Sequence, residues 1–160
     1  MFELLVGVVS FVSAVVFAAV WGAHLLETTV LFRIWAADPA HALPAFVATP
    51  YSMRLAGFWR ALAPSLYVTA SIAVVVAVIT GLRPHLALAI AGVCGLIHMA
   101  MVFAIFLPTN TKLGFYSGAP ASLDPQVVTA LVRRWGGWNS VRLGVETLGL
   151  VAALVALKAS

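Results

Sequence analysis

Four apolar stretches, each long enough to cross a lipid bilayer, constrain this chain more than any other feature of its sequence. A membrane-spanning helix needs about 20 mainly apolar residues, and the 160 residues hold four such stretches joined by short polar segments. Proline and charged residues set their expected bounds at about 2–35, 58–80, 85–107 and 125–157. The sequence therefore predicts one all-α transmembrane domain, residues 1–160, folded as an integral membrane four-helix bundle.

The composition excludes a soluble domain. Of all residues, 63% are hydrophobic and only 9% are charged, whereas a soluble domain carries about 25% charged residues. The net charge of +4 is small and scattered, so we expect contacts with membrane lipid and no binding of nucleic acid. The single cysteine, Cys94, can form no internal disulfide and leaves the redox compartment open.

Proline and polar residues mark the segments between the predicted spans. We expect a short interfacial helix within residues 46–58 and a loop over residues 110–124. Asp124 then caps the fourth helix, with Pro125 at its first position. The first residues include no basic side chain, so the first apolar segment is expected to be retained as a span. The alternative is a signal peptide cut near Ala18.

The distribution of basic residues predicts the orientation in the membrane. With four spans both chain ends lie on one side, which also carries Arg83 and Lys158. The opposite side carries more basic residues, and the positive-inside rule places that side in the cytoplasm: Arg33, Arg54, Arg60, Lys112, Arg133 and Arg134. We therefore expect a multi-pass protein of the plasma (inner) membrane with non-cytoplasmic termini.

A polar stripe runs through the fourth apolar segment. Trp135, Asn139, Arg142 and Glu146 follow one another at i, i+4, i+7 and i+11, a spacing that places them on one face of a helix. Ionisable side chains are costly within a bilayer, so their presence there indicates a functional site by default.

The other spans contribute few polar residues, and these lie at similar depths. Counted from the expected cytoplasmic ends, at about 1.5 Å per residue, they lie roughly 12–18 Å inside the bundle. The sequence therefore predicts one polar pocket in the cytoplasmic half, with its mouth framed by the two longer loops. Its expected members are His24, Glu27, His98, Asn139, Arg142 and Glu146.

The charges of this pocket do not balance. Two glutamates face one arginine, and an uncompensated charge in a low-dielectric interior is unfavourable. A protonated glutamate, a protonated histidine, a bound metal ion, or an arginine folding back from Arg54 or Arg60 would relieve it.

Simpler structural readings exist for the same residues. Arg142 and Glu146 form an i, i+4 pair that would neutralise itself. A shifted first span would bring His24 and Glu27 to the headgroup level. The tryptophans are expected to anchor the helices at the membrane interfaces rather than to line a cofactor site: Trp21, Trp35, Trp59, Trp135 and Trp138.

Two motifs carry a resemblance to a known family. The segment Pro108-Thr109-Asn110-x-x-Leu113, followed by Trp135-x-x-x-Asn139-x-x-Arg142, resembles the anthrone oxygenase-like family of small four-span membrane proteins. The stretch from Gly22 to Glu27 is similar to the first span of bacterial members. The chain departs from the family pattern at Asn139, where many members have histidine, and after Glu27, where Thr-Thr-Val-Leu replaces His-Pro-Ala-Arg.

The resemblance implies oxidation of a planar, acidic, hydrophobic aromatic molecule by dioxygen. A glutamate or histidine, Glu146 or His98, would remove the acidic proton, and Arg142 with Asn139 would stabilise the developing oxyanion. Substrate contacts are expected from Trp135, Asn110 and Arg142. The oxidation would proceed either without a cofactor or with a non-haem iron or copper ion; the expected metal ligands are His24, Glu27, His98 and Glu146.

Two other classes of protein remain open on the sequence. A non-enzymatic module for a quinone, haem or lipid would use the same pocket, with His24 and His98 as axial haem ligands. A small transporter or assembly subunit would use the buried charges as a proton or ion path. In each case the partners are a hydrophobic small molecule or membrane lipid, and the chain is compatible with a homo-oligomer.

Overall fold

The chain folds as an all-α membrane bundle. The computed structural model describes residues 2–118 and 122–160, and within them four continuous helical segments are long and apolar enough to cross a membrane. The first comprises α1 (Phe2–Leu26), a π-helical turn η1 (Glu27–Leu31) and α2 (Phe32–Ala37), and the second is α4 (Pro50–Thr80). The third comprises α5 (Leu86–Met101), the π-helical turn η2 (Val102–Phe106) and α6 (Leu107–Lys112), and the fourth is α7 (Pro125–Ala159).

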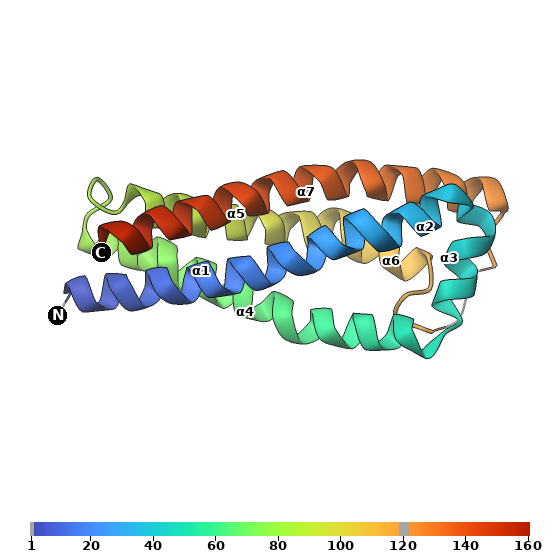
Figure 1. Ribbon diagram of the computed structural model, residues 1–160, viewed down its shortest axis with the longest axis horizontal. Helices are drawn as coiled ribbons and strands as arrows, with labels where there is room; N and C mark the ends of the chain where they lie inside the picture. The colour runs from blue at the N-terminus through green and yellow to red at the C-terminus, as the bar shows by residue number, and fades with distance from the viewer. Residues whose placement is uncertain (1, 119–121) are drawn as a thin grey trace.

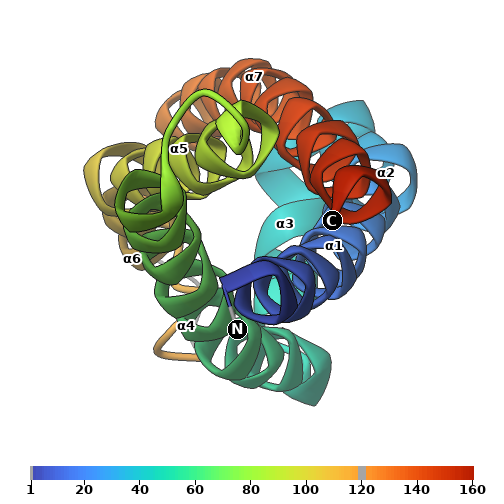
Figure 2. The same cartoon turned by 90° about the vertical axis from the view of Figure 1, so that its left-hand side faces the viewer.

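The four segments run alternately up and down the long axis of the molecule. Both chain ends therefore lie at one end of the bundle (Figure 1). In the view along the axis, α1, α4, α5 and α7 surround a common centre (Figure 2). The short helix α3 (Pro39–Val47) lies across the opposite end, between the first and second spans. The predicted four-helix bundle is thus confirmed.

The observed element bounds differ from the predicted ones around the connections. The interfacial helix expected within residues 46–58 lies earlier, at Pro39–Val47, because Pro50 starts α4 and Pro39 starts α3 as first-turn prolines. The loop expected from residue 110 begins later, because the third span continues as helix to Lys112. The cap of the fourth span is as predicted, since the Asp124 side chain accepts a hydrogen bond of 2.7 Å from the backbone N–H of Gln126.

Small residues let the helices approach closely in the half of the bundle that holds the termini. A Cβ atom added at Gly95 of α5 would overlap the side chain of Ala70 of α4. One added at Gly149 of α7 would overlap Phe17 of α1 and press on Cys94 of α5. Backbones at such distances gain van der Waals contact, which drives helix association where lipid removes the hydrophobic driving force.

The opposite half of the bundle is wider and is closed at its end by a hydrophobic plug. Helix α3 and the turn after α6 supply part of the plug, and the walls come from α2 and α7. We define the plug by five buried residues: Trp35, Leu43, Val47, Phe115 and Val132. This arrangement leaves polar side chains room between the helices just inside the plug.

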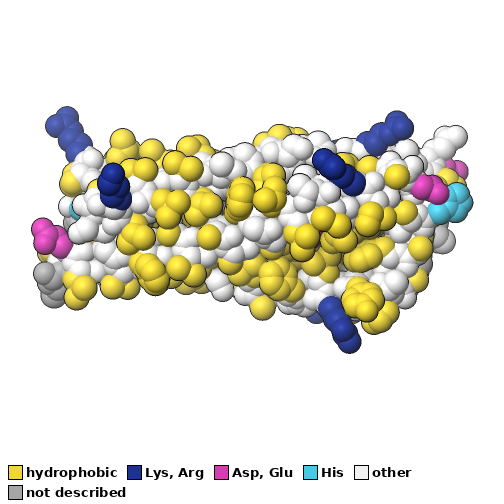
Figure 3. All heavy atoms as spheres, viewed as in Figure 1, with side chains coloured by type: hydrophobic (Ala, Val, Ile, Leu, Met, Phe, Trp, Pro, Cys, Tyr) yellow, Lys and Arg dark blue, Asp and Glu magenta, His cyan; other side chains and the backbone are white. Residues whose placement is uncertain are grey.

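The outer surface matches a bilayer. Apolar side chains cover the middle of the face shown in Figure 3, and Lys and Arg side chains stand toward its two ends. Many large apolar residues are exposed there, including Val68 at 60% and Val75 at 57%. Such a belt is stable against lipid rather than water, so the chain is a multi-pass membrane protein.

The glycine contacts predict a position-specific effect on stability. Gly149→Ala should lower the free energy of unfolding by about 1–3 kcal/mol, because the new methyl group overpacks the Phe17 site. Gly144→Ala in the same helix should be neutral or slightly stabilising, since no atom lies within 4 Å of its added Cβ and alanine favours a helix by up to ~1 kcal/mol. Thermal unfolding in detergent measures both, and equal melting temperatures would contradict this packing.

Candidate functional site

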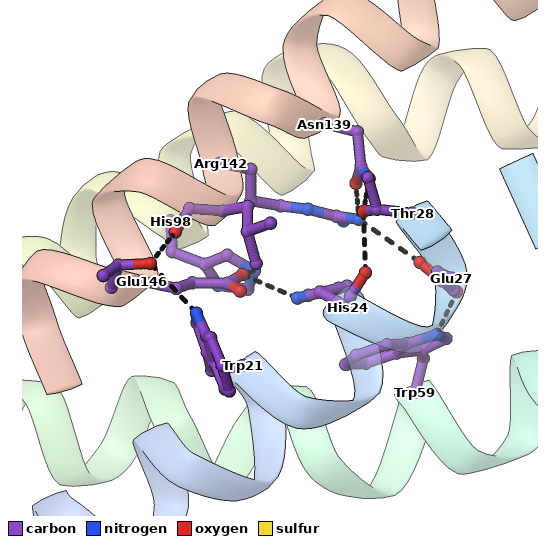
Figure 4. Close-up of polar contacts among 11 residues, drawn as sticks. Trp21, His24, Glu27, Thr28, Trp59, His98, Asn139, Arg142 and Glu146 are labelled. Carbon is purple, nitrogen blue, oxygen red and sulfur yellow. Dashed lines mark hydrogen bonds and ion pairs between the residues drawn. The ribbon is translucent and has the colours of Figure 1, made fainter. Parts of the chain in front are cut away.

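A buried cluster of polar side chains lies at the centre of the bundle, just inside the plug. His24 of α1, His98 of α5 and Glu146 of α7 meet there from three helices (Figure 4). The Glu146 carboxylate is fully buried, and its Oε1 atom lies 2.6 Å from His24 Nδ1 and 3.2 Å from His98 Nε2. The sequence prediction that these three residues face one another is therefore matched by their positions.

The two close contacts of Glu146 do not have the geometry of hydrogen bonds. Among the described residues, neither His24 Nδ1 nor His98 Nε2 forms a hydrogen bond, and both oxygens of Glu146 also lack one. Buried nitrogen and oxygen atoms are normally paired. Here one such atom from each of the three residues lies within 4.8 Å of the other two, a grouping that could hold a metal ion.

A second polar group lies beside the first, and both carboxylate oxygens of Glu27 accept hydrogen bonds within it. Arg142 of α7 forms an ion pair with Glu27 of η1, with 3.3 Å between its terminal nitrogen and Oε2. The other oxygen, Oε1, accepts a hydrogen bond of 2.7 Å from the indole N–H of Trp59. Asn139 accepts a hydrogen bond from Arg142 and donates one to the Thr28 hydroxyl. The guanidinium and the carboxylate are thus held rigidly against each other.

The pairing of charges differs from the simplest sequence reading. The i, i+4 spacing allowed Arg142 to neutralise Glu146 along the same helix, but Arg142 reaches across to Glu27 instead. Glu146 is left against two histidines. The surplus negative charge expected from the sequence is therefore localised at Glu146, where a proton or a metal cation would balance it.

The π-helical turns help to place these residues. Glu27 and Thr28 lie in η1, and η2 begins four residues after His98. A π turn inserts an extra residue into a helix, and such turns recur at functional sites. Neither turn has a recognisable sequence signal, which is why the alternative of a shifted first span could not be excluded from the sequence. The structure buries both His24 and Glu27.

A cavity adjoins the two polar groups. Its volume is about 70 Å³, several times the roughly 10–15 Å³ that holds one water molecule by the same measure. Four of the six predicted pocket residues line it, and the other two, Asn139 and Glu146, lie behind them. The polar lining consists of His24, Glu27, His98, Asn110 and Arg142, and the aromatic lining of Trp35, Trp59, Phe106, Phe115, Tyr116 and Trp135.

Three of the tryptophans belong to this site: Trp135, which was also expected as a substrate contact, and Trp35 and Trp59, which were expected only as interfacial anchors. Trp59 stacks on His24, with 4.0 Å between ring centroids and 12° between planes. Trp35 and Trp135 are buried in the cavity wall. The indole N–H of Trp135 donates a hydrogen bond of 3.1 Å to the Asn110 side chain. These two motif residues, which were predicted to lie at one site, are therefore in direct contact.

Trp59 and Phe106 are among the site residues that the sequence reading missed. Trp59 fixes both His24 and Glu27, and Phe106 lies under Arg142, with the guanidinium carbon 4.0 Å from the ring centroid. An aromatic face stabilises a buried cation. In the sequence, both residues are ordinary aromatics within apolar segments, so only the fold identifies them.

The donor set fits a single metal ion. One ligand atom from each of His24, His98 and Glu146 can be chosen such that all lie within 4.8 Å of one another. Donors bound to one ion at about 2.1 Å lie roughly 3–4 Å apart, so small side-chain adjustments suffice. Glu27, the fourth expected ligand, is outside this group, because Trp59 and Arg142 engage its oxygens.

The same contacts do not fit a haem. Axial histidines lie on opposite faces of the porphyrin plane. Here the two imidazole centroids are 5.5 Å apart, and Glu146 contacts both rings. The carboxylate occupies the space that the macrocycle would need, so the haem alternative is disfavoured.

Comparisons of the chain with protein-family models, with curated proteins and with solved structures found no match. The resemblance to the anthrone oxygenase-like family therefore remains a prediction based on its motifs.

The contacts of Trp59 predict a measurable role in the fold. Trp59→Phe retains an aromatic ring against His24 but removes the hydrogen-bond donor of Glu27. Leaving a buried carboxylate oxygen unpaired should lower the free energy of unfolding by about 1–3 kcal/mol. Trp138→Phe, at a position 38% exposed, should change it by less than ~0.5 kcal/mol. Unfolding in detergent tests the pair, and equal effects would mean that the Glu27 contact contributes nothing.

Proposed function

We propose that this protein is a membrane-embedded oxidoreductase of the oxygenase or oxidase type, acting on a small hydrophobic aromatic molecule with a metal ion held by His24, His98 and Glu146. The observation that carries the proposal is the convergence of these three buried donors beside an aromatic-walled cavity. Two histidines and one carboxylate with further positions open are the typical ligand set of non-haem iron(II) oxygenases. Copper is compatible with the same donors.

The residues around the donors support a metal centre. Trp59 stacks on His24 and fixes the plane of its ring, and orienting contacts of this kind tune ligand geometry. Because Glu146 is not paired with Arg142, its negative charge is available to a cation. When bound, the metal would activate dioxygen. Side chains of the protein would bind the substrate and stabilise its anion.

Arg142 is the residue best placed to hold a substrate oxygen. It lines the cavity, and its guanidinium is a permanent cation. A guanidinium beside an enol or phenol oxygen stabilises the anion formed when the substrate loses a proton. Asn139 acts indirectly, because its side chain contacts Arg142 and Thr28 and lies behind the cavity lining. We therefore assign it a positioning role.

The resemblance to the anthrone oxygenase-like family supports a specific reaction. An activated CH₂ group next to an aromatic ring is converted to a carbonyl, and dioxygen supplies the new oxygen atom. For anthrone the reaction balances as anthrone plus dioxygen giving anthraquinone plus water. Because the proposed metal would engage both His98 and Glu146, we assign neither of them as the base; Arg142, which lines the cavity, would favour loss of the acidic proton by stabilising the resulting anion.

Metal analysis tests the proposal. After reconstitution with iron(II) under anaerobic conditions, the purified protein should hold close to one ion per chain. His24→Ala, His98→Ala or Glu146→Gln should each weaken binding by roughly tenfold to a hundredfold or more. His41→Ala should not, because that side chain is 85% exposed and lies beside Asp38.

Turnover completes this test. The reconstituted protein should consume dioxygen in the presence of anthrone, and the three ligand variants should not. A metal-free protein that oxidises anthrone at the wild-type rate would overturn the metal-dependent mechanism. A protein that neither binds iron or copper nor consumes dioxygen would point to a binding module or transporter instead.

We propose further that the protein lies in the plasma (inner) membrane with both termini non-cytoplasmic. The exposed basic residues support this orientation, since more of them lie at the α3 end than at the terminal end.

Single-cysteine variants in a Cys94→Ala background test the orientation. A membrane-impermeant maleimide added to intact cells should label Ser160→Cys and leave His41→Cys unlabelled. These two positions lie at opposite ends of the bundle. The reverse labelling pattern would overturn the orientation while leaving the bundle intact.

A further inference from the structure

The bundle end nearest the cavity is closed. The plug residues Leu43 and Val47 of α3 are fully or nearly fully buried, as is Phe115 in the turn after α6. Trp35 packs against both Phe46 and Phe115, with ring centroids 5.2 and 5.5 Å apart. A ligand approaching along the bundle axis from this end would have to displace this packed aromatic group.

The flank of the bundle is open instead. Most cavity-lining residues are buried, but six of them are only half-buried and so mark the rim. Leu55, Trp59 and Ala63 lie on α4. Val102 lies on η2, Asn110 on α6, and Tyr116 in the turn after α6. We take these half-buried residues to mark a lateral mouth between the two walls; Leu55, Asn110 and Tyr116 lie in the segments that the sequence predicted to frame the mouth.

The mouth lies at the boundary between lipid headgroups and acyl chains. Arg60 is about 20 residues from the end of α4 at Thr80, which corresponds to ~30 Å of helix and equals the thickness of a typical hydrocarbon core. Arg60 therefore stands at the interface opposite the chain termini. Ala63 lies one turn deeper, among acyl chains, and Leu55 lies on the headgroup side.

The walls of the mouth suit a flat amphipathic molecule. The Arg60 guanidinium lies 6.0 Å from the Tyr116 ring, so this cation–π contact joins the two walls on the headgroup side. Farther in, the rings of Trp59 and Phe106 and the Arg142 side chain line the cavity, so aromatic surface and a positive charge adjoin a bound aromatic molecule.

We infer that the aromatic substrate of the proposed reaction enters from the membrane interface, sideways between α4 and η2–α6 beneath the Arg60–Tyr116 contact. The inference rests on the proposed function for the chemistry that follows binding, but the entry route stands on the geometry alone. Such a molecule partitions into the interface, where its concentration near the mouth greatly exceeds that in water.

Closing the mouth with a reversible crosslink tests the route. In a Cys94→Ala background, Arg60→Cys and Tyr116→Cys would be joined by a reducible bifunctional methanethiosulfonate reagent in lipid nanodiscs. The probe is 1-naphthol, and its entry is followed by quenching of tryptophan fluorescence in stopped flow. Crosslinking should slow association at least ~10-fold, and reduction should restore the original rate. Unchanged association in the crosslinked protein would overturn the route, as would a wild-type protein that takes up no 1-naphthol.

Two matched substitutions on α4 provide an independent test. Ala63→Phe narrows the mouth and should slow association of 1-naphthol at least ~10-fold. Ala61→Phe, on an exposed position of the same helix, should leave the rate unchanged. Equal rates for the two variants would contradict a lateral entrance at Ala63.

The charge of the probe separates entry from lipid and entry from water. A naphthol sulfonate, which stays in water, should enter far more slowly than 1-naphthol; equal rates would show that entry is from water. Iron binding by the crosslinked protein distinguishes the two proposals. Retained iron with blocked naphthol entry supports both proposals. Absent iron with naphthol entry that the crosslink still blocks defeats the metal centre and leaves the entrance standing.

Discussion

The buried ion pair between Arg142 and Glu27 is the interaction on which the rest of the site depends. Removing two charges from water is costly, and only close pairing with further hydrogen bonds offsets that cost. The structure meets this requirement through Trp59, Asn139 and the Phe106 ring, which come from α4, α7 and η2. The pair and its partners therefore tie all four spans together at the level of the cavity.

This pairing also sets the chemistry available to the remaining charge. Because Arg142 is committed to Glu27, Glu146 lies against His24 and His98 without a cationic side chain of its own. One side of the site thus gathers metal-type donors, and the other presents a fixed guanidinium to the cavity. The proposed oxidation uses both, since a substrate held by its oxygen at Arg142 would place its ring toward the histidines.

The architecture and most of the site could be predicted from the sequence, because the physical constraints behind them act on single residues or single segments. Apolar length defines spans in a bilayer, and a buried ionisable residue such as Arg142 or His98 is too costly to be accidental. The sequence could not show which buried charged side chains pair with each other. The choice of Glu27 over Glu146 as the partner of Arg142 depends on how α1 and α7 pack and on the π turn at Glu27. The role of Trp59 depends likewise on the neighbouring helix, because an aromatic residue in an apolar segment suits lipid, core or site equally well.

A double-mutant cycle on unfolding in detergent tests the division of charges most directly. Arg142→Met would be combined separately with Glu27→Gln and with Glu146→Gln. Direct contact predicts a coupling energy of about 2–3 kcal/mol between Arg142 and Glu27, at least twice that between Arg142 and Glu146. A larger coupling to Glu146 would mean that the arginine neutralises its own helix neighbour, and the assignment of Glu146 to a metal centre with the two histidines would fail.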